Sequence, residues 1–118
     1  FAVEIYDVNA ASFVDVTDGA SGSSSTASVS LTTTVDNAAS FGIAGLVTST
    51  TADPGSGYTE IDIGNQESVT KTGIYDLDVG SAGSKTPSIT WGTSQGWAMA
   101  AVAFAPVSGA SVAASCPG

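Results

Sequence analysis

The sequence predicts an all-β protein, an antiparallel β-sandwich or jelly roll. Apolar and polar residues alternate over short segments along the 118 residues, and the spacing typical of an amphipathic helix is nearly absent. Clusters of Gly, Ser, Pro and Asp separate these segments, as they do in sandwiches and barrels, so about eight strands are expected. No segment suits the crossover helix that a parallel sheet needs.

The first half of the chain supplies four of the expected strands. They span residues 1–8, 12–17, 28–35 and 41–48. The segment 18–25 (DGASGSSS) is expected to be a flexible connection, and Asp36-Asn37 a turn. In the fourth strand, Phe41, Ile43 and Val47 share one face, and we expect Phe41 to be buried.

The second half begins with a sharp turn at residues 52–57. Pro54 fixes its φ angle there, and Gly55 permits a positive φ. Strands are expected at 58–63, 69–79, 87–92 and from residue 96 onward, with a turn at 80–85. In the strand 69–79, alternation places Tyr75, Leu77 and Val79 inward.

The sequence also predicts how its two ends are arranged. Residues 1–106 are expected to form the sandwich, and residues 107–118 a flexible C-terminal arm. The first strand has apolar residues on both sides, which is typical of a central strand covered on both faces. We therefore expect its neighbour to come from a preceding N-terminal half, a separate chain or a symmetry copy through sheet-edge pairing.

Composition excludes several classes of function. Eleven acidic residues against two lysines, with no Arg and no His, give a net charge of −9. This charge argues against binding to nucleic acids or to anionic membranes. The absence of His excludes a Ser–His–Asp triad, and the single Cys excludes an internal disulfide and a Cys-rich zinc site. The chain has 18 Ser and 14 Thr, a composition common in secreted and surface-displayed proteins.

Three stretches together carry a family resemblance. They are SVSLTTT at 28–34, DPGSGYT at 53–59 and WGTSQGWAMAAVAFAP at 91–106. In this order they resemble the C-terminal half of jelly-roll-like β-sandwich domains of prokaryotes and phages that end in a Trp-Ala-x-x-Ala-Val-Ala-Φ-x-Pro strand. Such domains occur in secreted, cell-surface and virion-associated proteins. The resemblance implies a display or structural setting and carries no catalytic residues with it.

Carboxylates are the side chains in this sequence that could form a catalytic or metal site. Glu60, Asp62 and Glu67 lie close in sequence and could act as a glycosidase pair, but solvated strand faces explain them better. Asp76 and Asp78, or alternatively Asp15 and Asp18, could join backbone carbonyls around a calcium ion. Their spacing matches no EF-hand, so no metal, cofactor or enzymatic activity is expected.

Aromatic side chains and the cysteine are the remaining candidates. Tyr58, Trp91 and Trp97, with Tyr75, could stack on the rings of a glycan. Core packing is the favoured alternative, with Trp91 and Trp97 clamping the core across a hairpin at 92–96. Cys116 could form an intermolecular disulfide, or be an inert terminal residue.

Two classes of function remain. The first is a non-enzymatic structural or assembly module on an extracellular surface, either a virion component of the head-decoration or fibre type or a subunit of a cell-surface filament. The second is a lectin-like carbohydrate-binding module. Because the sequence holds few Asn and Gln residues for sugar recognition, we favour assembly with copies of itself or other structural chains.

Overall fold

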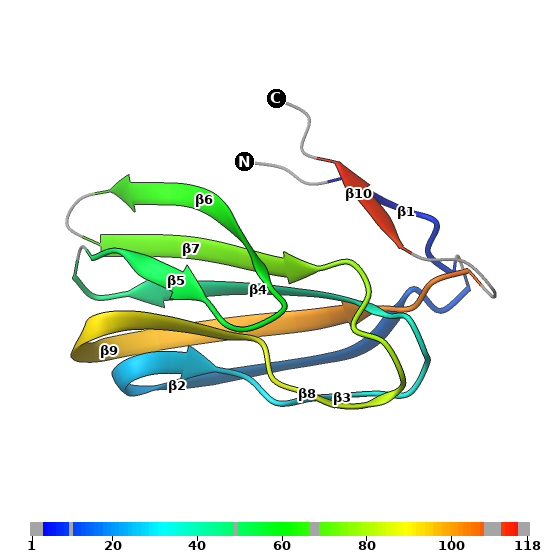
Figure 1. Cartoon of the computed structure of the whole chain (residues 1–118), viewed down its shortest axis with the longest axis horizontal. Coiled ribbons are helices and arrows are strands. Elements are labelled where there is room, and N and C mark those ends of the chain that lie inside the picture. Colours follow the sequence, from blue (N-terminus) through cyan, green and yellow to red (C-terminus); the bar gives the residue numbers. More distant parts are fainter. Residues whose placement is uncertain (1–3, 10, 49, 67–68, 108–111, 116–118) are drawn as a thin grey trace.

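Short alternating segments give ten strands and no helix in the described part of the chain (Figure 1). The computed structural model describes residues 4–9, 11–48, 50–66, 69–107 and 112–115, with the backbone alone for 62–66, 69 and 115. The strands are β1 (Glu4–Tyr6), β2 (Val14–Ser28), β3 (Leu31–Thr33), β4 (Ala39–Leu46), β5 (Ala52–Pro54), β6 (Thr59–Gln66), β7 (Val69–Asp76), β8 (Gly83–Lys85), β9 (Ser88–Phe104) and β10 (Ala113–Ser115). The predicted all-β class is confirmed.

All strand pairs are antiparallel. The larger sheet has the order β2-β9-β4-β7-β6, and β5 pairs with the first residues of β9. Two further pairs, β3–β8 and β1–β10, complete the described sheets. The packing of these sheets against one another makes the antiparallel sandwich that the sequence predicts.

The paired strands β2 and β9 contribute to both layers of the sandwich. Their register is regular from Val16 to Ser24 and then shifts, because Ser24 lies opposite Gln95 whereas Thr26 lies opposite Thr90. At this irregularity both strands curl over, so that β5 and the start of β9 lie across the rest of the sheet (Figure 1). The expected connection at 92–96 is therefore wrong, since β9 runs through it without a hairpin.

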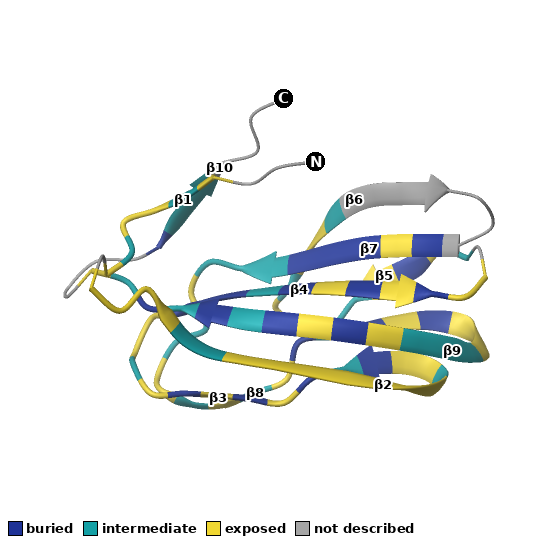
Figure 2. Cartoon of the chain, turned by 180° about the vertical axis from the view of Figure 1, so that it is seen from behind, coloured by how far each residue is buried: buried dark blue, intermediate teal, exposed yellow. Residues whose placement is uncertain are grey.

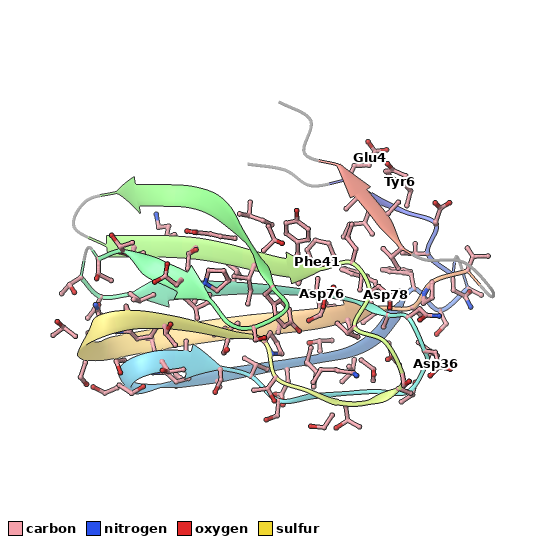
Figure 3. The ribbon with its side chains drawn as sticks, in the orientation of Figure 1. Glu4, Tyr6, Asp36, Phe41, Asp76 and Asp78 are labelled. Atoms are coloured by element: carbon pink, nitrogen blue, oxygen red, sulfur yellow. The ribbon has the colours of Figure 1, made fainter. Side chains whose placement is uncertain are left out.

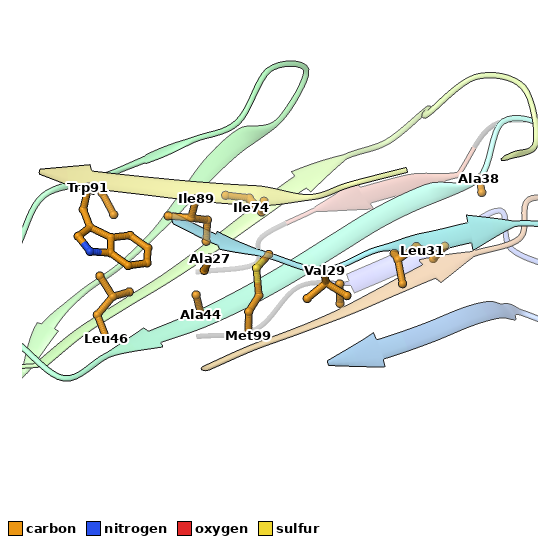
Figure 4. Close-up of a cluster of buried hydrophobic side chains, with 13 residues drawn as sticks. Ala27, Val29, Leu31, Ala38, Ala44, Leu46, Ile74, Ile89, Trp91 and Met99 are labelled. Atoms are coloured by element: carbon orange, nitrogen blue, oxygen red, sulfur yellow. The ribbon is translucent and has the colours of Figure 1, made fainter. Parts of the chain in front are cut away.

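Most inward residues of β4 and β9 are small, and they lie in the core beside larger side chains from both layers. The inward face of β4 carries Ser40, Gly42, Ala44 and Leu46, and that of β9 carries Met99, Ala101 and Ala103. Most of these residues form a single buried cluster with Val29, Leu31, Ile89 and Trp91 (Figure 4). A Cβ at Gly42 would lie 2.7 Å from Met99 Cε, so the flexible end of the Met99 side chain occupies the space that the missing Cβ leaves.

The opposite face of β4 is turned away from the core. Ile43 is 51% exposed and Val47 61% exposed, whereas Phe41 is half-buried. The expectation that Phe41 is buried is therefore only partly correct. The physical reason is the core packing, because the opposing large side chains need the small face of β4 against them.

In strand β7 too, the residues that face the core differ from the predicted inward residues Tyr75, Leu77 and Val79. Thr70, Thr72 and Ile74 are its buried inward residues; Gly73 is also buried, and Tyr75 lies half-buried, on the other face. Thr70 tolerates burial because its hydroxyl donates to the carbonyls of Thr48 and Thr50. Val79, which follows the strand, packs against the core as expected.

The segment 18–25, expected to be a flexible connection, is instead part of β2. It pairs residue by residue with β9 from Asp18 opposite Ala101 to Ser24 opposite Gln95. Small residues have little strand preference of their own, so the partner strand supplies the hydrogen bonds that order them. In the turn at 52–57 the positive φ is 85° at Gly57, not at Gly55 as expected.

The two ends of the described chain pair with each other. Glu4, Ile5 and Tyr6 of β1 lie opposite Ser115, Ala114 and Ala113 of β10. The expectation that the first strand needs a neighbour from outside this sequence is therefore wrong for these residues. The segment 107–118, expected to be a flexible arm, contributes β10 to this pair.

Trp91 tests the core packing. Trp91→Ala is expected to lower the free energy of unfolding by about 3–5 kcal/mol, because the indole is 7% exposed and lies in the buried cluster. Trp91→Phe is expected to cost far less, since it removes an indole N–H that is buried without a hydrogen-bond partner in the described residues. Urea unfolding followed by circular dichroism measures both variants, and equal losses would contradict this packing.

Candidate functional site

The most distinctive surface of the protein is the outer face of the larger sheet, which is turned away from the core. Residues paired across antiparallel strands share a face, so Ile43 lies beside Ala100 and Gly73, and Gly45 lies beside Ala98 and Lys71. The described residues of this outer face are Val14, Thr17, Gly19 and Ser21 of β2; Phe41, Ile43 and Gly45 of β4; Thr59 and Ile61 of β6; Lys71, Gly73 and Tyr75 of β7; and Ala98, Ala100, Val102 and Phe104 of β9. Figure 2 shows the alternation of buried and exposed residues along β4 and β9.

The outer face carries no carboxylate among its described residues, although the chain has eleven acidic residues. Among these described residues Lys71 is the single charged one. Other parts of the molecule hold the described carboxylates: Asp15 accepts hydrogen bonds from the Thr34 amide and hydroxyl, and Asp36 accepts one from the Ala82 amide. The described carboxylates therefore lie away from this face.

A row of four aromatic rings crosses one end of the outer face. Phe13 stacks on Phe104 with ring centroids 6.5 Å apart, Phe104 meets Phe41 edge to face at 5.8 Å, and Phe41 stacks on Tyr75 at 6.0 Å. The row runs from the residue before β2 across β9 and β4 to β7. Contacts of this kind stabilise the sheet, and they also keep four apolar rings at its surface.

Beside this row the face is hollowed at Gly45. Two adjoining depressions of about 350 Å³ and about 630 Å³ both have Gly45, Lys71 and Ala98 in their walls. Ile43 borders the smaller depression and Val47 the larger, and an added Cβ on Gly45 would meet no atom within 4 Å. We call this feature the Gly45 hollow.

The three aromatic residues predicted as glycan contacts do not form one platform. Trp91 is buried in the core cluster. Trp97 is half-buried, packs against the core and donates from its indole N–H to Ser24 Oγ at 2.9 Å. Tyr58 is also half-buried and donates to Ser40 Oγ at 3.0 Å. Packing, the favoured alternative, accounts for the positions of all three.

The aspartates predicted as calcium ligands accept hydrogen bonds from backbone amides. Asp76 accepts a hydrogen bond from the Asp78 amide, and Asp78 accepts one from the Gly80 amide. Figure 3 shows both near Asp36 at one end of the sandwich. Asp18 accepts from the Gly19 amide, while Asp15 bonds Thr34. In the described residues no group of three or more acidic, His or Cys side chains could hold a metal ion.

The structure describes the side chain of only one of the four remaining candidate residues, Glu60, Asp62, Glu67 and Cys116. Glu60 is exposed, and its carboxylate accepts from the Thr72 hydroxyl at 3.5 Å. The side chains of Asp62 and Glu67 lie outside the described residues, so the glycosidase pair stays untested. Cys116 also lies outside the described residues, and its predicted disulfide stays a prediction.

Sequence reasoning missed the residues of the outer face. One signal was available, because the segments 38–47 and 96–107 contain no charged residue and are apolar on both strand faces. Two-sided apolar strands can belong to a sheet that is covered on both sides. Here one side is the core and the other is the outer face.

Comparison of the chain with protein-family models, with curated proteins and with solved structures finds no match. No helix that could cross a membrane occurs in the described part of the chain.

Tyr58 gives a pH test of the arrangement. Burial of the ring raises the pKa of its hydroxyl above the ordinary value of 10.0; the hydrogen bond to Ser40 opposes this shift, and the negative charge of Asp76 adds to it. A raised pKa means that the folded state favours the neutral phenol, so this contribution is complete below pH 10 and is lost as pH rises through the folded-state pKa.

The expected result is a decline in the free energy of unfolding above pH 10 that is smaller in Tyr58→Phe. Urea unfolding between neutral pH and pH 11 measures the difference between the two proteins. The same alkaline decline in both would mean that Tyr58 is not responsible.

Proposed function

We propose that this protein is a non-enzymatic structural module that takes part in assembly on an extracellular surface. The outer face carries this proposal. It combines exposed apolar side chains, a row of four aromatic rings and no carboxylate among its described residues, in a chain with a net charge of −9. Contiguous exposed apolar surfaces of this kind mark sites that another molecule covers.

The chemistry of the face supports a protein partner better than a carbohydrate. Sugar recognition needs polar groups that hydrogen-bond to hydroxyls beside the stacking rings. Around the aromatic row, three of the four rings are phenylalanines, and Tyr75 contributes the one phenol. The two tryptophans, which would be the strongest stacking groups, pack against or within the core. Protein interfaces, by contrast, have aromatic and apolar centres depleted of charge.

Composition and family resemblance support the setting. The chain is rich in Ser and Thr and poor in Lys, and it resembles domains of secreted, cell-surface and virion-associated proteins. A virion component of the head-decoration or fibre type and a subunit of a cell-surface filament both use such modules as building blocks. Absence of His and Arg from the sequence supports a role without catalysis.

A polysaccharide-binding screen tests this proposal against its alternative. Insoluble cellulose and chitin, and soluble glucans, mannans and galactans, are incubated with the wild-type chain and with Phe41→Ala. We expect no saturable binding, because the outer face lacks a set of sugar-recognising polar groups. Saturable binding that Phe41→Ala weakens at least tenfold would overturn the assembly role in favour of a carbohydrate-binding module.

A further inference from the structure

We propose that a second copy of this chain covers the outer face, with the two sheets packed face to face about a twofold axis. The inference rests on the proposed assembly function and names the partner at the same site. Three features of the face support it: its shape, its area and its distribution of charge.

The shape of the face is self-complementary. Ile43 and Val47 project on either side of Gly45, and the Gly45 hollow lies between and beside them. In a contact about a twofold axis, a residue of one copy enters a site on the partner, and the same residue of the partner enters the same site on the first copy. A face that holds both a projecting Ile43 and a hollow lined by Gly45 and Ala98 meets this requirement. Small residues around the hollow also allow the sheet separation of about 10 Å found in sandwiches.

The area of the face matches the smallest stable dimers. The eight residues of β4 at about 3.4 Å each, and five strands about 4.8 Å apart, give a surface of roughly 650 Å² per copy. Two copies would bury roughly 1,300 Å², within the range of about 1,200–2,000 Å² of specific interfaces.

The charge distribution favours a copy of the same chain over a charged partner. A basic partner would be recognised through carboxylates, and the described outer face has none. An acidic partner would need a cationic cluster, and Lys71 is the single cation on the face. Two copies can meet through this face while their described carboxylates stay outside the contact. Since each copy carries −9, added salt should strengthen the association.

Analytical ultracentrifugation from low micromolar to several hundred micromolar protein tests the inference. We expect a concentration-dependent monomer–dimer equilibrium that is tighter at high than at low NaCl concentration. Ile43→Lys should raise the dimer dissociation constant at least tenfold, because it places a charge at the centre of the contact. Ser84→Lys adds the same charge at an exposed site on β8, away from the outer face, and should change the constant less than twofold.

A second variant separates shape-specific packing from general stickiness. Gly45→Leu places an apolar side chain at the hollow, and its Cβ meets no atom within 4 Å. It should weaken dimerisation at least tenfold although it makes the face more apolar. Gly92→Leu is the matched control, because Gly92 is exposed and equally free of neighbours but lies outside the outer face. Circular dichroism confirms that each variant is folded.

The outcomes are distinct. A protein that stays monomeric at every concentration overturns the second copy as partner, and the polysaccharide screen above still decides the assembly role separately. A dimer that neither Ile43→Lys nor Gly45→Leu weakens shows that another surface is used, and it also overturns the inference. A dimer that Gly45→Leu strengthens indicates unspecific apolar contact and overturns it as well.

Discussion

The burial of the small inward residues of β4 and β9 is the constraint on which the rest of the structure depends. Gly42 and Ala44 of β4, with Ala101 and Ala103 of β9, form a shallow inward surface. Larger side chains, Val29, Leu31, Ile89 and Trp91 among them, share the buried core with it. Interiors are packed to crystal-like density, so large groups on both layers would overfill this space. Large-against-small packing fixes which face of each central strand turns inward.

The outer face follows from the same constraint. Side chains in a strand alternate between faces, so turning Gly42 and Ala44 inward necessarily turns Phe41, Ile43 and Gly45 outward. The core therefore displaces apolar residues to the surface, where they gather into an aromatic row and a hollow. A sheet with apolar residues on both faces is ordinarily covered on both. In this protein one cover is its own second layer, and we propose that the other is a second copy.

Part of this architecture could be predicted from the sequence. The alternation of apolar and polar residues with a period of two identifies a strand without any knowledge of its partner strands. The all-β class, the Asp36-Asn37 turn and the burial of Trp91 all follow from local patterns. Where both faces of a strand are apolar, as in β4, alternation cannot decide which one is inward.

Other features depended on contacts distant in sequence. The segment 18–25 is ordered by β9, and β1 is paired by β10, neither of which has a local signal. The candidate site was missed for the same reason. Its residues come from five strands, and charge depletion becomes visible only when those strands lie side by side. The individually conspicuous residues, Trp91 and Asp76 for example, serve the core and a turn.

Thiol labelling of two neighbouring positions in β4 tests the face assignment most directly. In a Cys116→Ser background, which removes the single native cysteine, Ile43→Cys and Ala44→Cys are each treated with a maleimide in dilute solution. Ile43 is 51% exposed and Ala44 is 1% exposed, so the thiol at position 43 should react at nearly the rate seen in urea. The thiol at position 44 should be strongly protected until the protein unfolds. Rapid reaction at position 44 with protection at position 43 would show that β4 faces the other way, and would contradict both the core and the outer face described here.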